Sequence, residues 1–127
     1  MIDHIGFAVS NYAKAKAFYV AALKPLGITL MMEIPAEVKG DFAAGGFGKD
    51  GKGFFWISES QKPVGNLHFA LLGTRAAVDA FYKAAIAAGG KDNGAPGIRP
   101  HYHANYYAAF VIDLEGNSIE AVCHAPA

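Results

Sequence analysis

Three residues of the types that bind divalent metals stand in strand-like segments of this chain. His4 and His68 each lie inside a short apolar run, half a chain length apart. Glu120 lies between Ile119 and Ala121, and a carboxylate in an apolar strand requires a partner. Two imidazoles and one carboxylate can occupy one face of an octahedron and leave the other positions to water or substrate. Together these residues predict an open metal site, although each alone is also typical of an ordinary strand residue.

A second group of polar side chains lies in residues 99–107, which read Arg-Pro-His-Tyr-His-Ala-Asn-Tyr-Tyr. Histidine titrates near neutral pH, so His101 and His103, with Tyr102, are candidates for a general acid or base. Arg99 is a candidate partner for a substrate carboxylate, although a surface ion pair fits it equally well. The alternative for the whole segment is a solvated loop whose aromatic rings close the end of a sheet.

Three other aromatic residues are candidates for contact with a substrate. Trp56 and Phe55 stand in an apolar run and can line a pocket, with packing in the core as the alternative. Tyr106, at the end of the polar segment, is assigned to the same pocket.

The chain repeats itself after about half of its length, as two copies of one structural unit would. In each half an apolar run with a histidine is followed, about fourteen residues on, by Phe-Tyr-x-Ala-Ala and an aliphatic residue, at 18–23 and 81–86. Side chains alternate between the two faces of a strand. His4 and His68 therefore point away from the apolar face that meets the helix, and the same alternation allows Glu120 to converge with them.

Each half is expected to contain one strand, one helix and further strands. Asn11 or Ser10 can cap the first helix, and Thr74 can cap the second, which ends at the glycines 89–90. The predicted fold is α+β, with two βαβββ modules at about 1–62 and 63–127, whose mixed sheets form a cupped, partly open barrel with the helices outside. Strands are expected at 2–10, 28–34, 42–47, 54–58, 106–112 and 118–124, the first helix at 12–23, and a mobile glycine-rich hairpin or lid, or a substrate contact, at 40–53.

Composition excludes several classes of protein. Eleven basic residues balance eleven acidic ones, so no basic surface is expected to hold a nucleic acid. The single cysteine excludes a disulfide framework and a cysteine-rich zinc site. The apolar runs are shorter than the ~20 residues of a membrane span, and the chain does not open on a basic and apolar leader. We expect a cytoplasmic protein without a nucleic-acid or membrane partner, and the low charge favours an oligomer.

Four segments together resemble the vicinal oxygen chelate superfamily, which includes glyoxalase I, bleomycin-resistance proteins and extradiol dioxygenases. The most specific part is a strand, an Asp-x-x-Gly-Asn turn and a strand that bears Glu120. The resemblance covers essentially the whole chain and implies paired βαβββ modules with a divalent metal that binds neighbouring oxygens of a substrate or intermediate. On it, His4, His68 and Glu120 fall on the superfamily's ligand positions. The segments are 2–5, 17–19, 67–70 and 109–120.

One position departs from glyoxalase I, which takes a fourth ligand from the last strand of its first module. The repeat places that position at Phe55, Trp56 or Ile57, and none of these side chains can bind a metal. A set of three ligands better resembles the extradiol dioxygenases and the fosfomycin-resistance thiol transferases. The superfamily also includes drug binders that hold no metal.

Two functions therefore remain open. The first is an enzyme that uses Fe²⁺, Mn²⁺, Ni²⁺ or Zn²⁺ for lyase, isomerase or ring-cleaving dioxygenase chemistry on a small oxygenated molecule. The second is a dimeric protein of the bleomycin-resistance type that binds a small molecule or drug without chemistry. The resemblance also implies a homodimer in which His4 of one chain meets His68 and Glu120 of the other, with a site built within one chain as the alternative.

Overall fold

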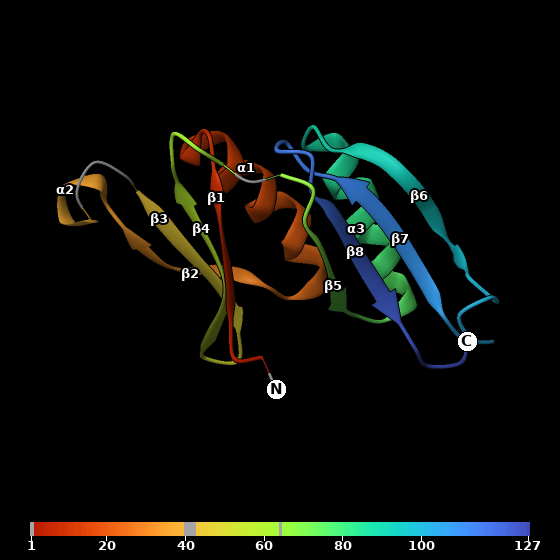
Figure 1. The fold of residues 1–127 in the computed structure, drawn as a ribbon. Coiled ribbons are helices and arrows are strands. Elements are labelled where there is room, and N and C mark those ends of the chain that lie inside the picture. Colours follow the sequence, from red (N-terminus) through yellow and green to blue (C-terminus); the bar gives the residue numbers. More distant parts are fainter. Residues whose placement is uncertain (1, 40–42, 64) are drawn as a thin grey trace.

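The computed structural model describes residues 2–39, 43–63 and 65–127, which form two sheets and two long helices (Figure 1). The elements are, in chain order, β1 (Ile5–Val9), α1 (Tyr12–Leu23), the 3-10 helix η1 (Lys24–Leu26), β2 (Thr29–Ile34), α2 (Ala36–Lys39), β3 (Ala44–Lys49), β4 (Lys52–Glu59), β5 (His68–Leu72), α3 (Arg75–Ala87), β6 (Lys91–Ile98), β7 (Tyr107–Ile112) and β8 (Ser118–Cys123). The strand order is β1-β4-β3-β2 in the first sheet and β5-β8-β7-β6 in the second. In the ranges described, the helices are too short or too polar to cross a membrane.

The two sheets are built in the same way, which explains the internal repeat of the sequence. In each sheet the first strand runs parallel to the last, with Ile5 opposite Phe55 and His68 opposite Ser118. The remaining strands pair in antiparallel fashion. The predicted α+β fold of two βαβββ modules with outer helices is therefore confirmed.

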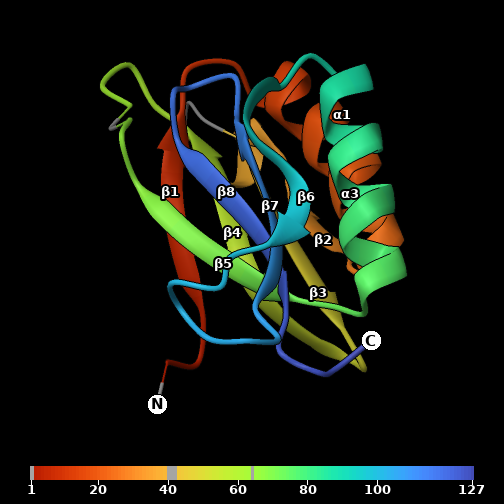
Figure 2. The same ribbon diagram turned by 90° about the vertical axis from the view of Figure 1, so that its right-hand side faces the viewer.

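Both long helices lie on one side of the sheets, where they also contact each other (Figure 2). The opposite side of each sheet has no helical cover among the described residues, and we call it the open face. Gly6 and Trp56 stand opposite each other on the open face of the first sheet, as Ala70 and Glu120 do on that of the second.

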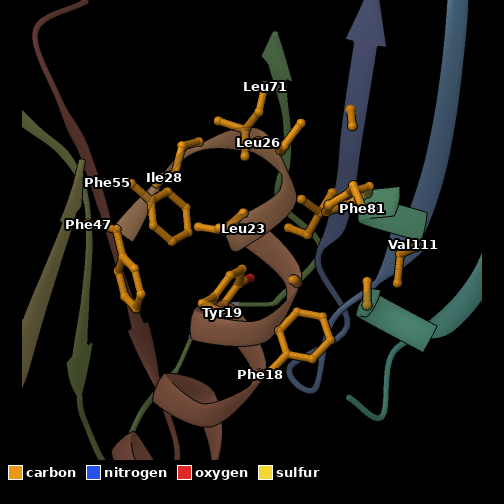
Figure 3. Close-up of a cluster of buried hydrophobic side chains, with 14 of the residues drawn as sticks. Phe18, Tyr19, Leu23, Leu26, Ile28, Phe47, Phe55, Leu71, Phe81 and Val111 are labelled. Atoms are coloured by element: carbon orange, nitrogen blue, oxygen red, sulfur yellow. The ribbon is translucent and has the colours of Figure 1, made fainter. Parts of the chain in front are cut away.

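The covered side of the sheets holds an aromatic core that α1 organises (Figure 3). Asn11 caps this helix, because its side chain accepts a hydrogen bond from the Lys14 backbone N–H at 3.0 Å. The Tyr19 ring centroid lies 5.0 Å from that of Phe55, which in turn lies 5.0 Å from that of Phe69 in the second sheet. One core therefore spans both modules, and the burial of these rings holds the two sheets side by side.

The Asp-x-x-Gly-Asn turn between β7 and β8 is a buried centre of hydrogen bonds. Asp113 accepts hydrogen bonds from the Tyr19 hydroxyl and from the backbone N–H groups of Glu115, at 2.9 Å, and Asn117, at 2.8 Å. The Asn117 side chain donates to Asp113 at 3.0 Å and accepts from the Leu67 backbone N–H at 3.0 Å. The turn thus fixes the start of β5 beside β8 and ties both strands to α1.

Strand β6, at the outer edge of the second sheet, lies in a segment for which the sequence predicts no strand. Its residues lack alternation, and Gly94 and Pro96 disfavour a strand. An edge position tolerates both, since the outer backbone groups are not needed for pairing, and the register with β7 shifts on either side of Gly94. The short helix α2 also lies where no helix is predicted.

The glycine-rich segment forms the hairpin of β3 and β4. Its turn contains Asp50 at φ 53° and Gly51 at φ 77°. Positive φ at both central residues gives a two-residue turn that matches the twist of the strands. The strand predicted at 42–47 is found at Ala44–Lys49, while residues 40–42 of the predicted hairpin lie outside the described part of the chain.

Candidate metal centre

His68 and Glu120 meet on the open face of the second sheet. His68 Nε2 lies 3.2 Å from Glu120 Oε1, and the glutamate is only 3% exposed. His68 Nδ1 lies 3.1 Å from the backbone carbonyl oxygen of Ser118, which can only accept a hydrogen bond. We therefore assign the ring proton to Nδ1, which leaves the lone pair of Nε2 directed at the carboxylate.

This contact has the spacing of two ligands on one metal ion. Two electron-pair donors that face each other require a proton or a cation between them. Ligand atoms at about 2.1 Å from a metal and at right angles to each other lie about 3 Å apart. The nitrogen and oxygen of this pair, at 3.2 Å, therefore fit adjacent positions around a divalent ion.

His4 is oriented in a similar way at the start of β1. Its Nδ1 lies 2.7 Å from Asp3 Oδ1, and the Lys52 ammonium lies 2.6 Å from the same oxygen. The hydrogen bond from Lys52, followed by that from His4, lowers the pKa of Asp3 below its ordinary value. A carboxylate accepts only, so Nδ1 carries the proton and Nε2 is left without one, which is the arrangement that metal-binding histidines commonly have. The position of Asp3, directly before a candidate ligand, is the signal that sequence reasoning missed.

A single chain does not bring the three predicted ligands together. In the described ranges, no three His, Cys, Asp or Glu side chains are close enough to hold one ion. The reason is the direction of the strands, because β1 and β5 face each other and run in opposite directions (Figure 1). His4 and His68 stand at the N-terminal ends of these strands, so they lie at opposite ends of the groove of about 770 Å³ between them.

The second oxygen of Glu120 has a different partner, which comes from the loop that precedes β7. The Tyr106 hydroxyl donates a hydrogen bond to Glu120 Oε2. Burial, and then the hydrogen bond to Glu120, raises the pKa of Tyr106 to about 12, so the phenol is protonated at neutral pH. Tyr106 is therefore a partner of a candidate ligand, a position that its sequence context did not indicate.

The two histidines of the polar segment have different partners. Turns at residues 100–102 and 104–105 replace the extended strand on which His101 and His103 would share a face. His103 Nδ1 accepts from the Asn105 backbone N–H at 3.1 Å, which places its proton on Nε2, 2.9 Å from His124 Nδ1. His101 instead packs against Tyr102, with ring centroids 4.2 Å apart, and both side chains are exposed.

Arg99 lies on the same side of the sheet as the His68–Glu120 pair. Its guanidinium carbon stands 5.4 Å from the Phe110 ring centroid, and Phe110 stacks on His68 at 6.3 Å and is opposite Glu120 in the ladder. Two guanidinium nitrogens donate to backbone carbonyls of β6, at 2.9 and 2.8 Å. The charge is thus fixed in place, with N–H donors left for a further acceptor.

Trp56 occupies the place in the first sheet that Glu120 occupies in the second. It is opposite Gly6 in the parallel pair, as Glu120 is opposite Ala70. The structure therefore resolves the three alternatives for the fourth ligand position in favour of Trp56. Its ring lies on Gly46, where a Cβ atom would come within 2.6 Å of the indole, so only glycine allows this placement. Beside the indole is a cavity of about 510 Å³ that His4 also lines.

Phe55 does not line the open face. Its side chain is 0% exposed and lies in the core beneath α1 (Figure 3), so the prediction that it contacts substrate is wrong. Successive residues of a strand point to opposite faces, which is why Phe55 and its neighbour Trp56 differ.

This difference predicts losses of stability of different size for two matched substitutions. Phe55→Leu should lower the free energy of unfolding by about 1–2 kcal/mol, because it removes packed ring contacts from the core. Trp56→Leu should lower it by less than about 1 kcal/mol, since the residue is only partly buried. Urea denaturation of the two variants and the wild type measures both values. A larger loss for Trp56→Leu would contradict this assignment of faces.

Comparison with known proteins agrees with this architecture. The family model described as Glyoxalase/Bleomycin resistance protein/Dioxygenase superfamily matches residues 1–121. A glyoxalase/bleomycin resistance protein from Albidiferax ferrireducens T118 is similar over 98% of this chain and 99% of its own, with 26% sequence identity and a TM-score of 0.76. A glyoxalase/bleomycin resistance protein/dioxygenase family enzyme from Burkholderia phytofirmans PsJN is 19% identical over 97% of this chain and 98% of its own, with a TM-score of 0.68. No curated protein matches the sequence.

A longer protein has the same fold. Glyoxalase I from Zea mays is 16% identical over 99% of this chain, with a TM-score of 0.75. This chain spans 45% of the maize protein. At so low an identity the likeness is one of fold.

Proposed function

This chain belongs to the glyoxalase/bleomycin resistance protein/dioxygenase superfamily, as its sequence resemblance implies, and on that premise we propose that it is a metal-dependent enzyme acting on a small oxygenated molecule. The supporting observation is the contact of His68 Nε2 with Glu120 Oε1 at 3.2 Å. His4, with its own Nε2 left open, is the third ligand for Fe²⁺, Mn²⁺, Ni²⁺ or Zn²⁺. When bound, the ion polarises two neighbouring substrate oxygens and stabilises the negative charge that develops on them in isomerisation, lysis or oxygenation.

The site is completed by a second copy of the chain. Among the described residues, the pair on the second sheet has no third metal-binding side chain close to it, and His4 on the first sheet has only Asp3 beside it. The open faces also carry exposed apolar side chains, with Met32 56% and Leu72 70% exposed. Placing the first sheet of one copy against the second sheet of the other covers these side chains and brings His4 to the pair. A two-fold axis then creates two equal sites.

The positive charge of Arg99, beside the His68–Glu120 pair, favours a substrate with an anionic group. Arg99 stands over Phe110, and Phe110 stacks on His68, so a single ring lies between the guanidinium and a candidate ligand. It retains donors for a carboxylate. Trp56, with the cavity beside it, supports an apolar or aromatic portion of the same substrate.

We assign proton transfer to titratable side chains at the edge of the open face of the second sheet. His101, His103 and Tyr102 carry titratable groups there, close to Tyr106. Of the two histidines, His103 is the better placed, because its ring contacts both Tyr106 and His124.

The metal can be tested without knowledge of the substrate. Wild-type protein titrated with Zn²⁺ or Ni²⁺ should bind one ion per chain and, at a free metal concentration of 100 times Kd, gain about 2.7 kcal/mol in stability. His68→Ala should lose both effects, whereas the exposed His101→Ala should keep them. Calorimetric titration and thermal denaturation with and without chelator measure the two quantities. Wild-type protein that binds none of Fe²⁺, Mn²⁺, Ni²⁺ or Zn²⁺ would rule out the enzyme proposed here.

The second candidate function is metal-free binding of an aromatic small molecule. The observation that favours it is Trp56, whose flat placement on Gly46 beside a cavity supports a stacking surface at a position where a metal ligand would otherwise stand. In that case aromatic compounds should quench the fluorescence of this single tryptophan equally well in wild-type protein and in His68→Ala, with chelator present.

A further inference from the structure

We propose that Tyr106 is a positioning residue that holds the Glu120 carboxylate in its metal-binding orientation, an inference that rests on the proposed function. Glu120 is almost completely buried, and each of its two oxygens has a different neighbour. Oε1 faces His68 Nε2 at 3.2 Å, and Oε2 accepts the hydrogen bond of the Tyr106 hydroxyl. With Oε2 engaged, Oε1 is the oxygen that would face an ion, so Glu120 would bind it through one oxygen.

The phenol can select this orientation because its own position is fixed. Three rings surround that of Tyr106, with centroids 4.8 Å away for Tyr102, 5.3 Å for His103 and 5.2 Å for His124. The hydrogen bond between the two histidines, at 2.9 Å, joins two of these rings. The Tyr106 backbone is also held, since its carbonyl accepts from the Arg99 N–H at 2.7 Å.

This arrangement gives the polar aromatic segment a definite role. Residues 99–106 join β6 to β7 and bring a hydroxyl to a buried carboxylate of strand β8. Groups that hydrogen-bond to metal ligands fix their orientation, and loss of one such group typically costs about 10–100-fold in metal affinity. The rings around Tyr106 therefore act on the metal site through Glu120, and none of them needs to touch the ion.

The test is Tyr106→Phe, which removes the hydroxyl and keeps the ring. The matched control is Tyr107→Phe, because the next tyrosine donates its hydroxyl hydrogen bond to Asp79 on the helix side of the same sheet. Titration with Zn²⁺ should give about 10–100-fold weaker binding for Tyr106→Phe than for wild type. The control should bind as wild type does.

A spectroscopic measurement separates positioning from general loss of structure. Co²⁺ bound to Tyr106→Phe should show a visible absorption spectrum different from that of wild type, because Glu120 is free to turn or to bind through both oxygens. The unfolding midpoint of the metal-free variant should stay within the range of the Tyr107→Phe control.

The outcomes distinguish this inference from the proposed function. If wild type binds Zn²⁺ and Co²⁺ while Tyr106→Phe keeps the wild-type affinity and spectrum, Tyr106 has no positioning role and the metal site stands. If wild type binds none of Fe²⁺, Mn²⁺, Co²⁺, Ni²⁺ or Zn²⁺, the metal site itself is wrong, and the role of Tyr106 is wrong with it.

Discussion

A mixed dimer of a His4→Ala subunit and a Glu120→Ala subunit is expected to bind metal tightly at one of its two sites. Each homodimer of either variant should lose more than about 100-fold in affinity, because loss of a group that merely orients a ligand already costs about 10–100-fold. In the mixed dimer, one site draws His4 from the Glu120→Ala subunit and takes His68 and Glu120 from the other. All three of its ligands are intact.

The fraction of metal sites that should be intact in such a mixture can be calculated. Equal amounts of the two variants, allowed to exchange, form half mixed dimers, so about one quarter of all sites are intact in a two-fold symmetric assembly. Equilibrium dialysis with Zn²⁺ at a concentration that saturates wild type measures this fraction. The control is His4→Ala protein alone, taken through the same exchange and dialysis.

Two results would contradict the shared site. Mass spectrometry of native dimers can show that exchange has occurred, and no recovery in such a mixture would mean that the ligands do not meet across the dimer. Full retention of metal affinity in each single variant would mean that these residues are not the ligands.

The second large effect is expected at the turn that precedes β8. Asp113→Ala should lower the free energy of unfolding by about 3–5 kcal/mol, since removal of a buried, hydrogen-bonded carboxylate leaves its donors without an acceptor. Asp113 is 6% exposed and accepts hydrogen bonds from the Tyr19 hydroxyl, two backbone N–H groups and the Asn117 amide. Urea denaturation of the purified variant measures the loss.

Asp79→Ala is the matched control for this experiment. Asp79 also accepts a hydrogen bond from a tyrosine hydroxyl, that of Tyr107, but on the exposed surface of α3. Its replacement should cost less than about 1 kcal/mol, because water replaces the lost partner. Similar losses for Asp113→Ala and Asp79→Ala would show that the buried turn is not a centre of stability.

The internal repeat, and with it the fold, can be predicted from the order of the residues alone. Side-chain alternation and two capped helices are local properties, so they predicted both modules and the placement of Phe7 and Val9 on the covered side. The candidate ligands His4, His68 and Glu120 also followed from residue type and from the matching positions of the two halves.

Contacts between distant segments depend on how the folded chain packs. Strand β6 forms because β7 offers an edge to pair with, although Gly94 and Pro96 oppose a strand locally. Register decided that Trp56, and not Phe55, stands on the open face. Tyr106 reaches Glu120 because it directly precedes β7, the strand that pairs with β8. The opposed directions of β1 and β5 keep His4 from His68 within one chain, and no pattern along the sequence reports the direction in which two edge strands meet.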